Sequence, residues 1–135
     1  MFLLDTNTIS ELMKRNPYTW EQLLAHERSS IFLCEVVVAE LLFGLSLLND
    51  AKKKNLLQRE LDPLLKTIDV LVWDRKTSQI FGDIKARLSR QGNLIADLDI
   101  AIAACALSHE CILITDNLSD FERIDDLKLV NWKGF

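Results

Sequence analysis

The chain has 135 residues, of which 49% are apolar and 27% charged, and its formal net charge is −4. These values predict one folded domain over residues 1–135 and exclude a long disordered region. No apolar run reaches the roughly 18 residues that a transmembrane helix needs, and the first residues lack the pattern of a secretory signal peptide.

Strand and helix patterns alternate along the first half of the chain. Asp5 comes directly after the first apolar run. Thr8 and Glu11, three residues apart, match a capping box and predict a helix from Thr8 to about residue 15. The other elements expected here are a strand at 2–4, a helix at 18–28, a strand at 31–34, a helix at 37–48, and a helix at 52–65 that Pro63 bends or breaks.

The second half continues the alternation. Its expected elements are a strand at 68–73, an amphipathic helix at 75–90 stopped by Gly92, a buried alanine-rich helix at 97–107, a strand at 111–115 and a last strand at 127–132. Strands that alternate with helices predict an α/β fold with a central, mostly parallel β-sheet flanked by helices.

Four carboxylates stand at positions where the pattern calls for an apolar residue or where a strand ends. Asp5 follows the first strand and Asp116 follows "CILIT". If these strands are neighbours, both acids lie at the edge of the sheet where α/β proteins bind ligands. Glu40 and Asp99 lie within apolar helices, where an ionised carboxylate is rare without a partner.

Each acid also has an ordinary structural explanation. Asp5 and Asp116 could form turns or caps at strand ends, and Glu40 could pair with an arginine, although no basic residue lies within a helical turn of it. Asp97 and Asp99 could offset a helix dipole. These two diverge by roughly 200° around a helix, so Asp97 is expected to cap the helix while Asp99 points inward.

A shared cation explains all four acids at once. Carboxylates that approach one another raise one another's pKa and disfavour ionisation. Mg²⁺, or Mn²⁺ in its place, binds carboxylate oxygens and leaves room for water and phosphate oxygens. Zinc is not expected, because Cys34, Cys105 and Cys111 lie in apolar runs without metal-ligand spacing. Such unpaired thiols indicate a reducing, cytoplasmic location.

Charge is unevenly distributed along the chain. Segment 75–90 is basic, whereas segment 110–126 is acidic. A basic segment can bind a polyanion locally even in an acidic protein, although a solvated helix face explains each charge run equally well.

Four motifs in this order, "LLDTNTISEL", "VVVAELLFGL", "DLDIAIAACAL" and "LITDNLSDFERI", resemble those of the PIN-domain ribonucleases, and more narrowly the VapC toxins. The resemblance runs from residue 2 to about residue 132, and "AELLFGLSLLNDAKKKNLLQREL" is similar to the FitB-like branch. It implies a PIN-like fold.

The resemblance also implies the site. By this resemblance the acidic centre of the family corresponds to Asp5, Glu40, Asp99 and Asp116, the last of which ends the strand expected at 111–115. Relatives vary in the position of this fourth acid, and Asp120 is a further candidate for support or substrate contact. The remaining candidates for orienting the acids or contacting substrate are Thr6, Asn7, Asp97, Thr115 and Asn117, for which turn chemistry is the alternative.

The implied activity is that of an Mg²⁺-dependent endoribonuclease toxin that inhibits translation. The candidate contacts to RNA backbone are Lys85, Arg87 and Arg90, and a tRNA anticodon stem-loop is a substrate by analogy only. The family further implies a VapB-type antitoxin whose tail lies in a groove walled by helices 9–15 and 37–48, together with a homodimer and a larger complex with the antitoxin.

Two other functions remain open. Haloacid-dehalogenase-type phosphatases also begin with a strand that ends in aspartate, but they carry a second aspartate where this chain has Asn7. A non-catalytic PIN scaffold that binds RNA or protein typically lacks one or more of the acids, and this chain has all four.

Overall fold

The structure is a computed structural model that describes residues 1–134. Its strands are β1 (Phe2–Leu4), β2 (Ile31–Cys34), β3 (Asp69–Leu71), β4 (Ile112–Ile114) and β5 (Leu129–Val130). Its helices are α1 (Thr6–Met13), α2 (Pro17–Ala25), α3 (Glu35–Ser46), α4 (Ala51–Thr67), α5 (Arg75–Arg90), α6 (Asp97–Ser108) and α7 (Leu118–Phe121), with a 3-10 turn, η1, at Arg28–Ser30.

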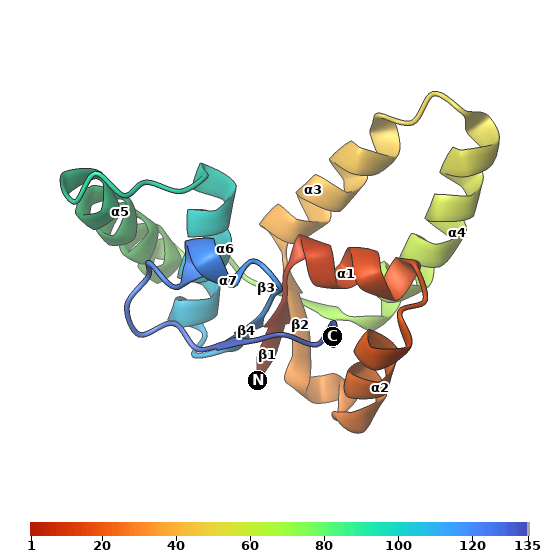
Figure 1. Cartoon of the computed structure of the whole chain (residues 1–135), viewed down its shortest axis with the longest axis horizontal. Helices are drawn as coiled ribbons and strands as arrows, with labels where there is room; N and C mark the ends of the chain where they lie inside the picture. The colour runs from red at the N-terminus through yellow and green to blue at the C-terminus, as the bar shows by residue number, and fades with distance from the viewer. Residues whose placement is uncertain (135) are drawn as a thin grey trace.

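The five strands form one sheet in the order β3-β2-β1-β4-β5, and every pair of neighbours is parallel. Figure 1 places α1 to α4 on one side of this sheet and α5 to α7 on the other. The α3–α4 pair extends away from the sheet as one arm, and α5 packs on α6 as the other. The predicted α/β fold with a parallel sheet is confirmed.

The core explains why α6 is apolar on nearly every side. All residues from Ile100 to Ala106 are buried, because α6 is covered by the sheet and by α5 together. The small alanines allow this close approach, and leucine and isoleucine side chains from α5 and from the strands fill the remaining space. Neither α6 nor any other helix within residues 1–134 has both the length and the apolar character that crossing a bilayer requires.

The start of α1 differs from the prediction. The helix begins at Thr6, directly after β1, and its N-cap is Asp5 rather than Thr8. The Thr8 hydroxyl instead lies 2.8 Å from Asp5 Oδ1 and 2.9 Å from the Ile114 carbonyl oxygen, and its one proton is shared between these two acceptors. The predicted capping box is therefore wrong, because Asp5 occupies the cap position first.

Four other element predictions are corrected. α2 ends at Ala25, where the backbone becomes extended. α4 continues through Pro63 without a break, since buried Leu61 and Leu64 hold this turn against the core. The short helix α7 was not predicted, and the N-cap of α6 is Ala96, so Asp97 does not cap that helix.

Three helices end in the same backbone motif with different residues. α1 ends with Arg15 at φ +62°, and the Asn16 N–H donates to the Glu11 carbonyl at 3.0 Å. As predicted, α5 stops at Gly92, which has φ +63° while Asn93 N–H donates to the Leu88 carbonyl at 2.8 Å. α6 ends with Glu110 at φ +57° in the equivalent position. The left-handed region suits glycine and strains other residues.

Exchanging these residues should shift stability in opposite directions. Gly92→Ala is expected to lower the free energy of unfolding by about 1 kcal/mol, because space around Gly92 is open and only backbone strain is added. Glu110→Gly is expected to raise it by about 0.5–1 kcal/mol. Urea denaturation of both variants measures the two shifts, and shifts of the same sign would contradict this account of the helix ends.

Candidate functional site

The predicted meeting of two strand ends is confirmed by the pairing of β1 with β4. Leu4 lies opposite Ile114 in the register, and the Asp5 amide donates to the Ile114 carbonyl at 3.1 Å. The residues that follow each strand therefore emerge together at the carboxyl edge of the sheet. Asp5 and Asp116 are close enough for the Asp116 charge to raise the pKa of Asp5.

Asp5 is the most enclosed of the four acids, with 4% of its surface exposed. Its Oδ1 accepts hydrogen bonds from the backbone amide and the hydroxyl of Thr8, both at 2.8 Å, and the Thr115 hydroxyl also bonds the carboxyl group. Burial nevertheless outweighs these bonds and raises the pKa of Asp5 above its ordinary value. The hydrogen bonds thus fix the orientation of the carboxyl group, and a nearby positive charge would stabilise its ionised form.

Glu40 reaches the same region from α3. Cys34, the last residue of β2, is the N-cap of this helix, so Glu40 projects over the carboxyl edge of the sheet. Its side chain is half-buried, and its Oε1 accepts a hydrogen bond of 2.7 Å from the Thr6 hydroxyl. The Thr6 hydroxyl thus fixes the direction of the Glu40 carboxyl group, and a role of Thr6 in the reaction stays a prediction.

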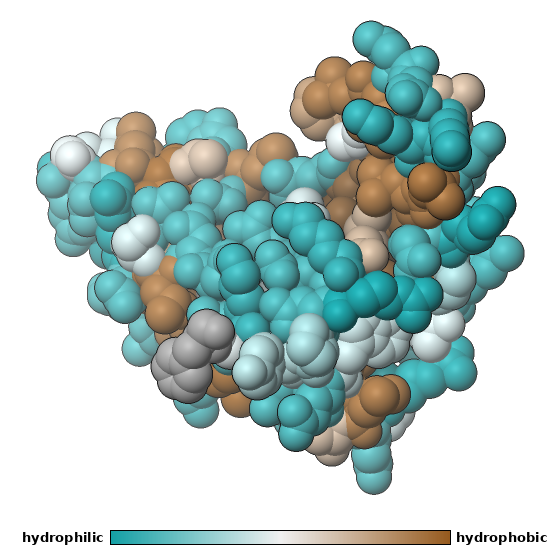
Figure 2. All heavy atoms as spheres, turned by 45° about the vertical axis from the view of Figure 1, so that its right-hand side comes forward, coloured by the Kyte–Doolittle hydropathy of each residue, from teal (hydrophilic) through white to brown (hydrophobic). Residues whose placement is uncertain are grey.

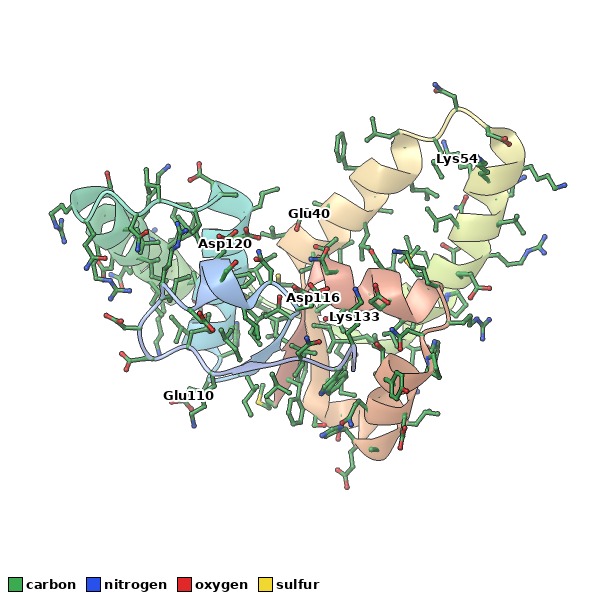
Figure 3. The ribbon with its side chains drawn as sticks, viewed as in Figure 1. Glu40, Lys54, Glu110, Asp116, Asp120 and Lys133 are labelled. Carbon is green, nitrogen blue, oxygen red and sulfur yellow. The ribbon has the colours of Figure 1, made fainter. Side chains whose placement is uncertain are left out.

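Asp99 comes from the first turn of α6. Its pKa is raised to about 6, first by burial and then by the charges of Glu40, Asp120 and Asp5, in this order. The carboxylates of Glu40 on α3, Asp120 on α7 and Asp5 after β1 are therefore near enough to Asp99 on α6 to act on its pKa, and Figure 3 labels two of these acids, Glu40 and Asp120. We call Asp5, Glu40, Asp99 and Asp120 the acid cluster.

Asp116 and Asp120, the two candidates for the fourth acid, face different partners. Asp116 accepts a hydrogen bond of 3.1 Å from Asn7 and lies 3.8 Å from the ammonium group of Lys133. Asp120 accepts one of 3.3 Å from Asn117 and is an electrostatic neighbour of Asp99. Figure 3 shows Asp116 beside Lys133, with Asp120 on α7.

Asp97 turns away from the acid cluster and forms an ion pair of 3.0 Å with Lys85. Arg87 pairs with Asp125 at 3.4 Å, and Arg90 is exposed at the end of α5. Of the predicted RNA contacts, Lys85 and Arg87 are thus already held by acids of this chain, and their role stays a prediction.

The acid cluster suits a hard cation by its chemistry, but it is not a closed cage. Within residues 1–134 no three Asp, Glu, His or Cys side chains converge tightly enough to hold an ion by themselves. None of the ion pairs found in that range involves a member of the acid cluster. Mg²⁺ typically binds through one or two carboxylates and completes its shell with water and phosphate oxygens, so the donor set fits this ion.

Two hollows flank the acid cluster, and both include Thr6 and Glu40 in their walls. The first, which we call the Trp73 hollow, has about 610 Å³ and is lined by Thr6, Glu35, Val36, Ala39, Glu40, Phe43, Trp73 and Leu98. The second, the Lys14 hollow, has about 290 Å³ and is lined by Thr6, Ser10, Met13, Lys14, Glu40, Leu41, Gly44 and Leu57. Trp73, Phe43 and Lys14 were not predicted as site residues, because periodicity does not report which side chains border a cavity.

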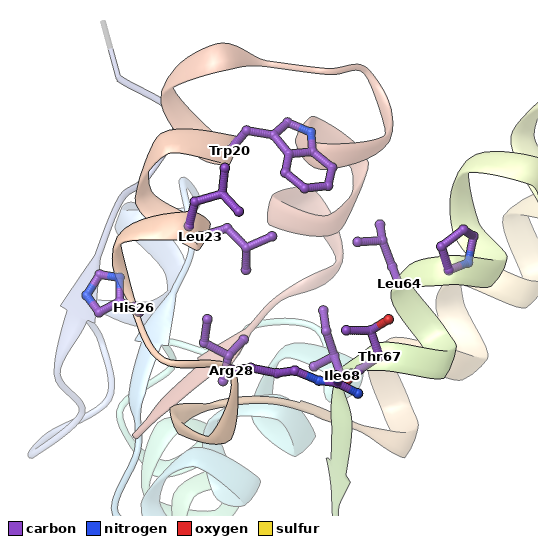
Figure 4. Close-up of a pocket in the computed structure, with 10 residues that line it drawn as sticks. Trp20, Leu23, His26, Arg28, Leu64, Thr67 and Ile68 are labelled. Carbon is purple, nitrogen blue, oxygen red and sulfur yellow. The ribbon is translucent and has the colours of Figure 1, made fainter.

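A third hollow, of about 370 Å³, lies between α2 and the end of α4 (Figure 4). Its walls are mainly apolar, with Arg28 and Thr67 at one side. No acidic side chain lines it in the part of the chain that the structure describes. The acid chemistry of the molecule therefore lies at the sheet edge and not in this hollow.

Removing the Asp99 charge should stabilise the metal-free protein in a pH-dependent way. Because the pKa of Asp99 is raised to about 6 in the fold, the folded state loses stability as the pH rises from about 4 through 6. Asp99→Asn is therefore expected to raise the free energy of unfolding by about 1–2 kcal/mol near pH 8 in EDTA, a value discounted for partial exposure.

The same comparison near pH 4 should give almost no difference, since wild-type Asp99 is then protonated. Urea denaturation at both pH values measures this effect. Asp97→Asn is the matched control, because its exposed ion pair with Lys85 is expected to contribute less than about 1 kcal/mol. An Asp99→Asn gain of equal size at both pH values would contradict the assigned repulsion.

Comparison with known proteins agrees with this geometry. The family model described as PIN domain matches residues 2–127. The chain is 34% identical to Ribonuclease VapC2 of Haemophilus influenzae over 134 residues, which cover 97% of each chain. It is 30% identical to the tRNA(fMet)-specific endonuclease VapC of Shigella flexneri, again over 97% of each.

Solved structures give the same result. VapBC2 from Rickettsia felis, bound to a DNA fragment from its promoter, superposes with a TM-score of 0.85 and 26% identity, covering 97% of this chain and 98% of the other. The resemblance inferred from the four sequence motifs is thereby confirmed. The chain belongs to the PIN-domain family and, within it, to the VapC ribonucleases.

Proposed function

We propose that this protein is an Mg²⁺-dependent endoribonuclease and the toxin of a toxin–antitoxin pair, and that it hydrolyses RNA phosphodiesters to inhibit translation. The observation that carries the proposal is the acid cluster. Carboxylates from three other elements, those of Glu40, Asp120 and Asp5, add to burial in raising the pKa of Asp99, and no member of the acid cluster has an ion-pair partner among residues 1–134.

The acid cluster is proposed to hold the metal through Asp5, Glu40, Asp99 and either Asp120 or Asp116. The effect of the Asp120 charge on the pKa of Asp99 favours Asp120, whereas Asp116 is engaged by Asn7 and Lys133. When bound, Mg²⁺ supplies a water of lowered pKa and neutralises charge on the phosphate group. Mn²⁺ is expected to substitute because it accepts the same oxygen ligands.

The chain's own residues fix the aim of these acids. Thr8 holds Asp5 through two hydrogen bonds to one oxygen, and Thr6 holds Glu40. Thr115 is fully buried beside Asp5, where its side chain lowers the pKa of the Asp5 carboxyl group, and its hydroxyl accepts from the Asn117 amide at 3.0 Å. Such fixed orientation lowers the reorganisation needed during hydrolysis, which is proposed to leave a 5′-phosphate and a 3′-hydroxyl.

The structure bears on both alternatives that the sequence left open. The amide of Asn7 donates to Asp116 and has no acidic proton to give a leaving group, so a haloacid-dehalogenase-type step lacks its general acid. A non-catalytic scaffold has no need for several mutually repelling carboxylates at one edge, since their repulsion destabilises the fold.

A tRNA is the proposed substrate on the ground of the name of the Shigella flexneri relative, a tRNA(fMet)-specific endonuclease, and the anticodon stem-loop within it is proposed by analogy with the family alone. Arg90 is the exposed member of the predicted backbone contacts, and Lys85 and Arg87 would have to leave their present acids to bind phosphate. Because an RNA substrate of this kind is found in the cytoplasm, we propose that the protein acts there.

A VapB-type antitoxin is the proposed inhibitor. The Lys14 hollow runs between α1, α3 and α4, where the groove walls were expected, and its apolar lining beside Glu40 suits a peptide that also covers the acid cluster. The VapBC2 complex of the Rickettsia felis relative supports such a pair. A homodimer and a larger hetero-oligomer with the antitoxin are part of the same proposal.

Metal dependence and the acid cluster can be tested together. The purified chain is expected to cleave tRNA with Mg²⁺, to lose cleavage in EDTA, and to regain it with excess Mg²⁺. Asp5→Asn and Asp99→Asn are each expected to lower kcat at least about 1,000-fold while retaining the wild-type circular dichroism spectrum. Asp97→Asn, from the same helix turn as Asp99, is the control and should cleave within about threefold of wild type.

An Asp5→Asn protein that cleaves RNA and arrests growth as wild type does would contradict the proposal. Hydrolysis of a small phosphomonoester without cleavage of RNA would instead favour the phosphatase.

Thr6 allows a finer test of orientation. Thr6→Val keeps the side-chain shape but removes the 2.7 Å bond to Glu40, and we expect kcat to fall about 10–100-fold. Thr6→Ser retains a hydroxyl and should restore most of the activity. Steady-state kinetics measure both, and equal losses in the two variants would show that the hydroxyl is not what matters.

A further inference from the structure

The Trp73 hollow opens beside the acid cluster, and large apolar side chains are exposed in its walls. Phe43 is 64% exposed and Trp73 is 38% exposed. Leu98, one residue before Asp99, completes the opposite wall. Figure 2 shows apolar side chains on both arms that flank the notch in the surface. Because such side chains are costly to leave in water, a contiguous apolar wall next to a reactive centre indicates a bound partner.

Trp73 is held in place although it is exposed. Its Nε1 donates to the Ser78 hydroxyl at 2.8 Å, and its ring packs at 57° against Phe81, with the ring centroids 6.3 Å apart. Trp73 follows β3 at the same sheet edge as the acid cluster. The indole therefore presents a preoriented flat surface, and little side-chain freedom is lost when a ligand stacks on it.

Phe43 shares a face of α3 with Glu40, because residues three apart on a helix are neighbours. The aromatic ring and the metal-binding carboxylate of the proposed site are thus presented by one rigid element. A ligand that stacks on Phe43 or Trp73 lies next to a phosphate held at the acid cluster.

The charge of the hollow selects which part of a nucleotide it accepts. Its two ionisable residues are Glu35 and Glu40, and no basic side chain lines it among the described residues. A phosphate group would be repelled there. A neutral, planar group would be accepted, and the base of a nucleotide has a π-face that stacks on aromatic side chains.

We propose that the Trp73 hollow binds one unpaired nucleobase of the RNA substrate, adjacent to the phosphodiester that is cut, by stacking on Trp73 and Phe43. This inference rests on the proposed ribonuclease function and adds a requirement to it. The nucleotide beside the cut must be single-stranded or turned out of its helix, because a stacked and paired base does not expose its face.

The decisive experiment removes the base of the RNA and the aromatic side chain of Trp73 separately. After the cut is mapped in a synthetic RNA hairpin, abasic residues replace the nucleotide on each side of it in turn. One abasic RNA is expected to lower the wild-type kcat/KM by about 10–100-fold. Trp73→Ala should lower kcat/KM on the intact RNA by a similar factor and should then be nearly indifferent to that abasic residue.

Two further variants separate stacking from folding. Trp73→Phe keeps an aromatic face and should restore most of the activity, whereas Phe43→Ala should resemble Trp73→Ala. Leu24→Ala removes another exposed apolar side chain, from the hollow of Figure 4, and should cleave as wild type does. Circular dichroism and thermal unfolding confirm that each variant is folded.

A binding measurement makes the test independent of cleavage. With Mg²⁺ present, a short single-stranded RNA is expected to quench the fluorescence of Trp73 in Asp99→Asn, which does not cleave. The quenching is seen as a difference between Asp99→Asn and the double variant Asp99→Asn/Trp73→Phe. If wild type cleaves no RNA, the proposed function fails, and this titration alone decides whether the hollow binds bases.

Two outcomes would overturn the base-binding proposal. In the first, each abasic RNA lowers the kcat/KM of wild type and of Trp73→Ala by equal factors. In the second, Trp73→Ala and Phe43→Ala cleave RNA normally but escape inhibition by the antitoxin, which would assign the hollow to the protein partner.

Discussion

The parallel pairing of β1 with β4 is the constraint on which the site depends. It sets Leu4 opposite Ile114, so the polar residues that follow both strands leave the sheet at one edge. Successive residues of a strand point to opposite faces, and both leucines of β1 are fully buried, so the strand is covered on each side. A slip of one residue would move the carboxyl group of Asp5 into this apolar interior, and the cost of burying it there fixes the place of Asp5 at the sheet edge.

Asp5 serves the fold and the site with the same side chain. Its Oδ1 caps α1 through the Thr8 amide, while its burial raises the pKa of the carboxyl group. The cap stabilises the helix, but a buried carboxyl group that faces other acids destabilises the metal-free fold. A cation removes this conflict, and proteins commonly tolerate such local instability where activity requires it.

The sequence predicts the sheet and most of the acid cluster, because long apolar patterns and acids within them are strong local signals. It misses the start of α1, since Asp5 and Thr8 are both good caps and only the end of β1 decides between them. It cannot separate Asp116 from Asp120, because their directions depend on Lys133 and Asp99, which come from other parts of the chain. The sequence does not identify Trp73 as a site residue, because periodicity does not distinguish an exposed aromatic residue from a buried one.

Thr6 and Glu40 line both flanking hollows, and in the proposed function this position links substrate binding to inhibition. A base in the Trp73 hollow brings its phosphate to the acid cluster, and a peptide that extends from the Lys14 hollow over Glu40 reaches the same carboxylates. The two occupants compete for one side chain that Thr6 already holds in place. Inhibition by such a peptide therefore needs no change in the fold, because occupation of the space around Glu40 is sufficient to exclude the phosphate.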